Sequence, residues 1–283
     1  LEPYPLDMAL INQADKKTWD TQVTFIQKHL TNKIINEAFT HFPKEVNDHT
    51  IADIKRKLKG RLKNLNKIAD EYFKNINRYA VIKGTDKDDL FEVERLENGR
   101  TEIRGYRIKK GKKGDLFHQK QYSKKLTKEI WIYGLDDKDQ FHVYGNNKAK
   151  IKVRIIGGQN NGSKLTIYDY KSKKNTFISN KGVKKLSDKY NTNVYDYKKL
   201  KYNAIELFPT IGANPDDGVK VGLASSFTSY GFERNPFTSQ HTVALSYYFA
   251  TKGFDIQLTS EFANVFQNWT LGLEAAFTSP NYS

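Results

Sequence analysis

The chain has 283 residues, 38% of them hydrophobic, and a formal net charge of +15, so it can bury a core in about two domains. It contains no cysteine, which argues against a disulfide scaffold, a thiol nucleophile and a zinc–thiolate site. No run approaches the roughly 18 apolar residues of a membrane helix. From residue 205 onward, three basic and seven acidic residues give −4, which leaves +19 on residues 1–204. A strongly basic N-terminal part and a mildly acidic C-terminal part suggest that the two parts of the chain lie in different environments.

Two amphipathic helices are expected in residues 1–79. The first spans residues 15–42, with Asp15 as its N-cap and Pro43 marking its end. The second spans about residues 48 to 79, with an apolar stripe on one face. A charge run on such a helix is more often a solvated face than a nucleic-acid site, and an anionic membrane surface is the better partner. The basic residues of this face are Lys55, Arg56, Lys57, Lys59, Arg61, Lys63, Lys67 and Lys74.

From about residue 80 the pattern changes to short strands separated by turns that are rich in Gly, Asn and Asp. We expect residues 80–180 to form a compact all-β domain. Residues 181–217 are expected to be a linker that contains one more strand at 205–207. The strands of the β domain are expected at residues 79–82, 91–93, 101–103, 130–133, 141–144, 151–156, 165–168 and 176–178.

Three turns of this β region share a glycine, spaced polar residues and a following apolar residue, and they begin at Gly84, Gly134 and Gly157. They are similar to the calcium-binding nonapeptide roll, whose oxygens suit Ca²⁺. However, the turns start 50 and then 23 residues apart, whereas roll calcium is shared between stacked neighbouring turns. The third turn also has amides where acids are needed. Plain turns feeding strands are therefore predicted, and an enzyme that uses calcium stays a third possibility.

The sequence predicts no catalytic residue, no metal site and no cofactor. None of the six histidines forms a metal-spaced pair with an acid or with another histidine, and His142 is expected on a sheet surface. Neither a Gly-x-Ser-x-Gly elbow nor a phosphate-cradling Gly-Lys-Ser/Thr loop occurs. No pair of carboxylates is distinguished as an acid–base couple. This chain is therefore expected not to be an enzyme.

The last part of the chain, residues 218–283, alternates apolar and polar residues in four rows that begin at residues 219, 243, 254 and 269. Period two is typical of strands, and strands of about ten residues with one apolar face and aromatic ends are typical of a membrane β-barrel. Acidic residues of these rows fall on the other, lumen face. The predicted lipid-facing residues are Val243, Leu245, Tyr247, Phe249, Phe254, Ile256, Leu258, Phe262, Trp269, Leu271, Leu273 and Phe277.

These strands could belong to a membrane β-barrel or to a soluble β-rich module. A short turn at 251–253 and a longer loop at 232–240 alternate as periplasmic turns and external loops do in a barrel. Four strands cannot close, because the smallest such barrels have about eight, and an open edge in hydrocarbon leaves backbone groups unpaired. We therefore expect a piece of a longer barrel protein. The alternative is a soluble, secreted, basic β-rich binding module for polyanionic surfaces, whose last sheet packs against its own β domain.

Several motifs then occur in order along the chain, and together they resemble one family. With them the chain is similar to the C-terminal half of large exported proteins. Those proteins carry an N-terminal calcineurin-like metallophosphoesterase domain and a C-terminal bacterial-surface-antigen outer-membrane barrel. The motifs are Gly84-Thr-Asp-Lys-Asp-Asp-Leu-Phe-Glu-Val-Glu-Arg95, Trp131-Ile-Tyr-Gly-Leu-Asp136, Val153-Arg-Ile-Ile-Gly-Gly158, Asn214-Pro-Asp-Asp-Gly218, Tyr230-Gly-Phe232 and Asn235-Pro-Phe237.

The resemblance covers most of the chain and implies that the chain lies between the enzyme domain and the completed barrel. The metal motifs of the phosphoesterase have no match here, so no catalytic residue is carried over. The expected fold is α+β: an N-terminal helical hairpin, a β-rich middle layer, and the antiparallel strands of an incomplete outer-membrane-type β-barrel. The expected partners are outer-membrane lipid, the remaining barrel strands and the upstream domain, with an anionic surface possible and no nucleic acid. The expected location is the outer membrane, with the N-terminal part periplasmic.

Overall fold

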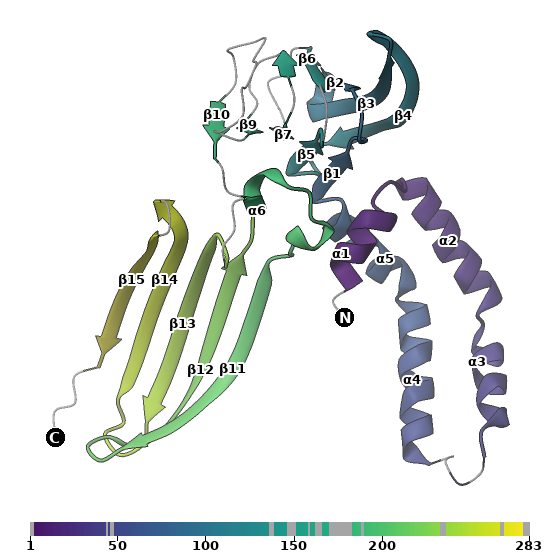
Figure 1. Ribbon diagram of the computed structural model, residues 1–283. Coiled ribbons are helices and arrows are strands. Elements are labelled where there is room, and N and C mark those ends of the chain that lie inside the picture. The colour runs from purple at the N-terminus through teal and green to yellow at the C-terminus, as the bar shows by residue number, and fades with distance from the viewer. Residues whose placement is uncertain are drawn as a thin grey trace. The chain divides into compact units, whose positions relative to one another are not determined.

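The computed structural model describes residues 3–43, 45, 48–135, 139–145, 151–157, 159–161, 166–169, 183–187, 190–232, 236–266 and 269–279 (Figure 1). The chain divides into two compact units: one is Leu6–Tyr195, and the other joins Leu1–Pro5 to Asp196–Ser283. The described strands form three five-stranded sheets, and none of the three closes on itself. The fold is therefore α+β, as predicted.

The N-terminal helices form a hairpin whose two arms lie side by side (Figure 1). One arm contacts the other through α2 against α5 and through α3 against α4. Edge-on packing of Trp19 against Phe73, with ring centroids 5.7 Å apart, fixes one end of the hairpin. The helices are α1 (Pro3–Leu10), α2 (Lys16–His29), α3 (Asn32–Ala38), the 3-10 turn η1 (Phe39–His41), α4 (His49–Lys63) and α5 (Leu65–Ile76).

Each of the two predicted long helices is in fact two helices. The first breaks at Leu30, whose ψ is 83°, and Thr31 starts α3 by accepting a hydrogen bond from the backbone N–H of Ile34 at 3.3 Å. The second breaks at Asn64, where α4 ends and α5 begins. Apolar spacing continues through both breaks, so the periodicity predicted one helix in each case.

Two sheets build the β region of the first unit. The parallel sheet has the order β1-β5-β7-β9-β10, and the mixed sheet has the order β4-β3-β2-β6-β8. The strands are β1 (Tyr79–Lys83), β2 (Asp89–Arg95), β3 (Arg100–Lys109), β4 (Lys112–Ser123), β5 (Glu129–Tyr133), β6 (Gln140–Tyr144), β7 (Lys152–Ile156), β8 (Gln159–Asn161), β9 (Thr166–Asp169) and β10 (Val183–Leu186).

The chain winds between these two sheets as a coil. It passes from the parallel sheet to the mixed sheet three times, from β1 to β2, from β5 to β6 and from β7 to β8, and each turn adds a strand beside the previous one. Identical side chains stack as a result: Phe91 and Phe141 are paired in register with ring centroids 5.3 Å apart. The core between the sheets contains Ala80, Ile82, Phe91, Val93, Ile103, Tyr122, Ile130, Ile132, Phe141, Ile151, Val153 and Ile155.

The sequence predicts a compact β layer, whereas the structure has two sheets joined by a regular coil of the chain. The β3–β4 hairpin is inserted between its first and second turns, and the 3-10 turn η3 (Glu97–Gly99) leads into that hairpin. The stretch expected as a linker contains β10, which pairs in parallel with β9, then α6 (Tyr190–Asn193) and the 3-10 turn η4 (Tyr197–Lys199). The strand expected at 176–178 lies outside the described residues.

The second unit is an antiparallel sheet in which each strand pairs with the next in the sequence (Figure 1). The four predicted rows are strands, and a fifth precedes them, where the sequence suggests only a short strand at 205–207. The strands are β11 (Ala204–Asn214), β12 (Gly218–Ser229), β13 (Ser239–Tyr248), β14 (Phe254–Phe266) and β15 (Trp269–Thr278). Their lengths, 10 to 13 residues, meet or exceed the 9–11 that a tilted strand needs to cross a bilayer.

Candidate lipid-facing surface

The strand register of the antiparallel sheet places the predicted apolar rows on one face. Leu223 pairs with Leu245, Leu245 with Ile256, and Ile256 with Phe277, so these four side chains lie side by side across four strands. Because side chains alternate between faces, the other members of each row lie on this face too. β11 adds Ile205, Leu207 and Ile211, opposite Phe227, Ser225 and Val221. We call this the apolar face.

On β12 and β13, exposure is the inverse of that in a water-soluble sheet. On β12 the apolar Leu223 is 46% exposed, whereas its neighbour Ala224 is 3% exposed. β13 alternates in the same way, with Val243, Leu245 and Tyr247 exposed and the intervening residues half-buried. Of the predicted lipid-facing residues, all but Ile256 and Phe262 are exposed. The apolar face is therefore uncovered by the described residues.

Aromatic side chains lie toward the two ends of this face, and aliphatic ones lie between them. At one end Tyr247 pairs with Phe254, and the Phe254 ring lies 6.0 Å from the Phe277 ring, centroid to centroid. At the other end are Phe262, which is in edge contact with His241, and Trp269, the first residue of β15. An aliphatic band with aromatic rims is the pattern of a membrane-spanning barrel wall.

The opposite face of the sheet is mostly polar, and it is buried most completely on β12. Its hydroxyl and amide side chains bond across strands: Gln240 Nε2 donates to Thr228 Oγ1 at 2.9 Å, and Thr242 Oγ1 donates to Ser226 Oγ at 3.2 Å. Asp255 also lies on this face and is buried. Acidic residues are thus on the side that the sequence predicts to face a lumen.

The sheet has two open edges within the described residues. β11 pairs only with β12, and β15 pairs only with β14. The turn from β13 to β14 is short and closed by a hydrogen bond from the Tyr248 N–H to the Gly253 carbonyl at 2.9 Å. The longer β12–β13 loop includes residues 233–235, which lie outside the described residues.

The starts of the three turns, at Gly84, Gly134 and Gly157, lie at neighbouring corners of the coil, so the spacing argument against calcium is wrong on this point. Gly84 N–H donates to the Tyr133 carbonyl, and Gly134 N–H to the Ile156 carbonyl, at 2.8 and 2.9 Å. A Cβ on Gly84 would lie 2.7 Å from the Gly134 carbonyl oxygen, so the corner requires glycine for close packing.

Two described carboxylates at these corners, those of Asp89 and Asp139, are nevertheless used within the protein. Asp89 accepts hydrogen bonds from the Thr85 backbone at 2.6 Å and from Arg107 at 3.1 Å, and its own N–H donates to Asp139. Residues 136–138 and 158 lie outside the described residues. Among the residues that are described, no group of three or more potential metal ligands occurs. These contacts make the carboxylates turn-stabilising groups.

Buried ionisable side chains of the coil also have partners within it. Glu129 accepts hydrogen bonds from Arg154 at 2.7 Å and from the Trp131 indole at 2.9 Å. Burial raises the pKa of the Glu129 carboxyl, but the hydrogen bonds and charge of Arg154, together with Trp131 and Lys152, outweigh burial and leave that pKa below its usual value. This cluster spans β5 and β7, so it joins neighbouring coils rather than forming a cleft.

On β4, burial lowers the pKa of His118 to about 4 and that of Lys120 to about 8. The Lys120 ammonium donates to the Asn12 carbonyl and lies 5.5 Å from the centre of the Tyr122 ring. These contacts hold β4 against the chain before α2. His142 is exposed on β6, as predicted, and does not belong to this group.

Of the helices in the described part of the chain, none is both long enough and apolar enough to span a bilayer. In comparisons with known proteins, the chain matches no family model, no curated protein and no solved structure.

Proposed function

We propose that the antiparallel sheet is part of the wall of an outer-membrane β-barrel, and that this chain is a non-catalytic piece of a surface-antigen-like protein. The helical hairpin and the coil would then lie on the periplasmic side. The ordered motifs that resemble metallophosphoesterase-associated barrel proteins support this assignment. In that arrangement, any hydrolysis belongs to an upstream domain, and the partners of this chain are lipid and the further strands.

One observation carries the proposal: on β12 and β13 the apolar side chains are exposed, while the small and polar residues between them are half-buried or buried. In water, leaving a large aliphatic side chain exposed forgoes about 1.5–3 kcal/mol relative to burying it. β12 and β13 repeat this arrangement along their lengths. In lipid the same arrangement is favourable, because the hydrocarbon covers the apolar face and the polar face lines the interior.

The register also defines the middle of the sheet. Leu258 lies opposite Val243 and Ala275, in the aliphatic band, whereas Leu271 lies opposite Phe262, toward an aromatic rim. The proposal therefore places Leu258 near the middle of the bilayer and Leu271 nearer one interface.

The test replaces Leu258 with Arg. An arginine on the lipid face at mid-bilayer costs about 2–4 kcal/mol, so Leu258→Arg is expected to reduce stable assembly into lipid vesicles. The matched control is Gln257→Arg, which adds the same side chain to the opposite, polar face of the same strand. Assembly is measured by flotation of the full chain with vesicles and by protection of the sheet from added protease.

Equal assembly of Leu258→Arg, Gln257→Arg and the unmodified chain would contradict lipid exposure of this face. The second candidate, a soluble basic module for polyanionic surfaces, is favoured by the seven basic residues between positions 55 and 67, a stretch without an acid. A monodisperse chain in detergent-free buffer, bound by a polyanion, would support that candidate and overturn the membrane assignment.

A further inference from the structure

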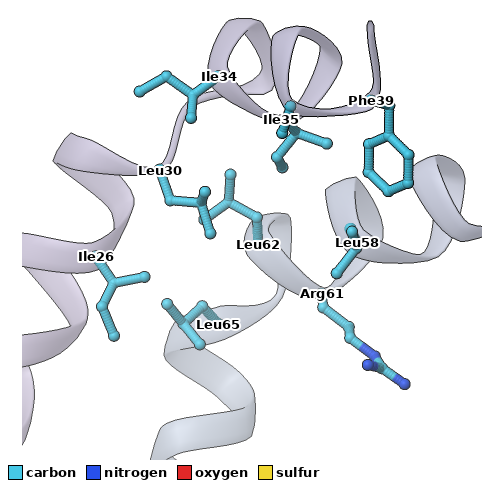
Figure 2. A pocket seen from close by; sticks show the side chains of 10 residues that line it. Ile26, Leu30, Ile34, Ile35, Phe39, Leu58, Arg61, Leu62 and Leu65 are labelled. Carbon is cyan, nitrogen blue, oxygen red and sulfur yellow. The ribbon is translucent and has the colours of Figure 1, made fainter. Parts of the chain in front are cut away.

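An apolar groove lies between the two arms of the helical hairpin, where both arms are broken (Figure 2). The breaks at Leu30 and Asn64 separate the helices on either side of it. Gln27 bridges the arms there, because its amide donates to the Leu62 carbonyl at 3.5 Å and accepts from the Asn66 amide at 3.4 Å. The groove is lined by Ile26, Leu30, Ile34, Ile35, Ala38, Phe39, Leu58, Arg61, Leu62 and Leu65.

The groove is open to solvent and almost entirely apolar. Its volume is about 250 Å³. Ile26, Leu30 and Ile34 in its wall are each more than 40% exposed, although the same arms bury Val23 and Ile35. The hairpin therefore closes on itself only in part and leaves an apolar channel that nothing in the described chain fills.

Two basic side chains are placed at the groove: Arg61 lines it, and the Lys55 ammonium lies 5.3 Å from the centre of the ring of Phe39, another lining residue. Between positions 55 and 67, on the α4–α5 arm, there are seven basic residues and no acidic one. The aliphatic stem of Arg61 borders the groove, and Figure 2 shows its guanidinium pointing away from the apolar side chains. This geometry, with an apolar stem and an outward charged head, is how basic side chains lie at the boundary between hydrocarbon and water.

The chemistry of the wall favours an acyl chain over a peptide. Its only charged member is Arg61, whose guanidinium is outside, so a backbone N–H or C=O inserted into the groove would find no hydrogen-bond partner. An acyl chain brings no polar group into the groove. An acidic phosphate attached to that chain would remain at the rim, among the basic residues of α4 and α5.

We propose that this groove takes an acyl chain of an anionic bilayer phospholipid, while the basic residues between positions 55 and 67 bind its phosphate and those of its neighbours. The helical hairpin would thus be a lipid-binding arm. The proposal concerns only the unit formed by Leu6–Tyr195, and it does not depend on whether the antiparallel sheet crosses a membrane.

The first test locates lipid at the groove. The chain has no cysteine, so a single cysteine can carry a fluorophore without competing sites. Ile34→Cys places the label in the groove wall, and Asn36→Cys places it on the exposed side of the same helix. With the whole 283-residue chain and phosphatidylcholine vesicles that contain nitroxide-labelled acyl chains, quenching at position 34 is expected only when phosphatidylglycerol is present. Quenching at position 36 is expected to be several-fold weaker.

The second test separates the groove from general charge attraction. Ala38→Trp fills the groove and leaves every charge in place, and it is expected to abolish the quenching of the label at position 34. Asn36→Trp is its control, since Asn36 does not line the groove. Arg61→Gln is expected to weaken hairpin binding to anionic vesicles about fivefold, as loss of one basic residue at a membrane surface does. Lys125→Gln, an exposed site in the turn after β4, is expected to have little effect.

Three results would overturn the proposal. The first is equal quenching at positions 34 and 36, and the second is equal quenching with and without phosphatidylglycerol. The third is a lipid-free dimer that Ala38→Trp converts to a monomer, because the occupant would then be a second copy of the chain. Far-UV circular dichroism of Ala38→Trp and Asn36→Trp is the control that checks whether the helices remain folded. The Leu258→Arg experiment tests the antiparallel sheet, whereas fluorescence quenching at positions 34 and 36 tests the groove. A negative result in one experiment therefore does not decide the other.

Discussion

The parallel sheet of the coil and the antiparallel sheet of the second unit each have five strands. They differ in the exposure of their apolar side chains. Ile132 in the parallel sheet is 0% exposed, whereas Leu258 in the antiparallel sheet is 46% exposed. The coil folds a second sheet over its apolar side and forms its own core. The antiparallel sheet instead joins small polar side chains across strands on one face and leaves the aliphatic face exposed.

This difference shows that the alternating pattern alone does not fix the surroundings of a strand. Period two separates two faces, but it does not say which face is covered. In the coil, the apolar face of each sheet is covered by the other sheet, and the two faces form the core. In the second unit, the apolar face has no protein cover among the described residues, and we propose that lipid covers it. The predictions below test that contrast.

The largest effect is expected in the coil core. Phe91 is fully buried between Phe141 and Phe117, so Phe91→Ala removes a stacked ring and leaves a cavity, at a cost of about 3–5 kcal/mol in the free energy of unfolding. Phe117→Ala is the matched control, with an expected cost of about 1–2 kcal/mol because that ring is already 38% exposed. Chemical denaturation measures both, and equal losses would contradict the described core.

A second prediction compares two depths on the apolar face. Leu258→Arg is expected to cost about 2–4 kcal/mol of assembly in lipid, whereas Leu271→Arg, nearer an aromatic rim, is expected to cost about 0–1 kcal/mol. The measurement is the fraction of each variant that remains with vesicles over a denaturant series. If both arginines have the same effect, depth does not matter, and the face is covered by something other than a bilayer.

A third prediction concerns acid stability of the coil. Because the Glu129 pKa in the folded protein is below its unfolded value near 4.5, the stabilisation by this carboxylate is fully present above pH 4.5 and is lost as the pH falls through the folded pKa. Glu129→Gln is expected to be less stable than the unmodified chain at neutral pH and to approach it in acid. Unfolding measured across this pH range tests the prediction, and a pH-independent difference would contradict it.

A fourth prediction concerns alkaline pH and Lys120. Its folded pKa of about 8 lies below the unfolded value of 10.5, so the unfolded chain binds more protons between these limits and stability rises with pH there. Burial raises the pKa of Tyr122 above its usual 10, which opposes the rise at higher pH. Lys120→Met is expected to lack the rise between about pH 8 and pH 10. Identical pH slopes in thermal melts of the two proteins would contradict this account.

The sequence predicted the strands of the second unit and the shared face of their apolar residues, because period two is a local pattern. It missed most of β11, where Pro209 interrupts the apolar row and Phe208 adds a large apolar residue to the other face. Proline has no backbone N–H to donate, and an edge strand tolerates it because one side of that strand has no strand partner among the described residues. A proline in a central strand would have broken the sheet.

The coil was not predictable in the same way, because its pairs are distant in sequence. Phe91 and Phe141 stack only after the β3–β4 hairpin is looped out, and spacing along the chain hides this neighbourhood. The groove was missed for a related reason: its walls meet at two helix breaks, and the apolar period runs through both. Thr31, a good N-cap residue within the predicted helix, is the one local signal that indicated a break.

The inserted β3–β4 hairpin also bears on how the coil can change in length. β1 pairs with β5 across 50 residues, whereas β5 pairs with β7 across 23. The entropy of closing a loop grows only with the logarithm of its length, so this roughly twofold difference adds on the order of 0.6 kcal/mol. The corner after β2 is therefore a place where evolution or engineering can add or exchange a segment at little thermodynamic cost, while the turns on either side keep their register.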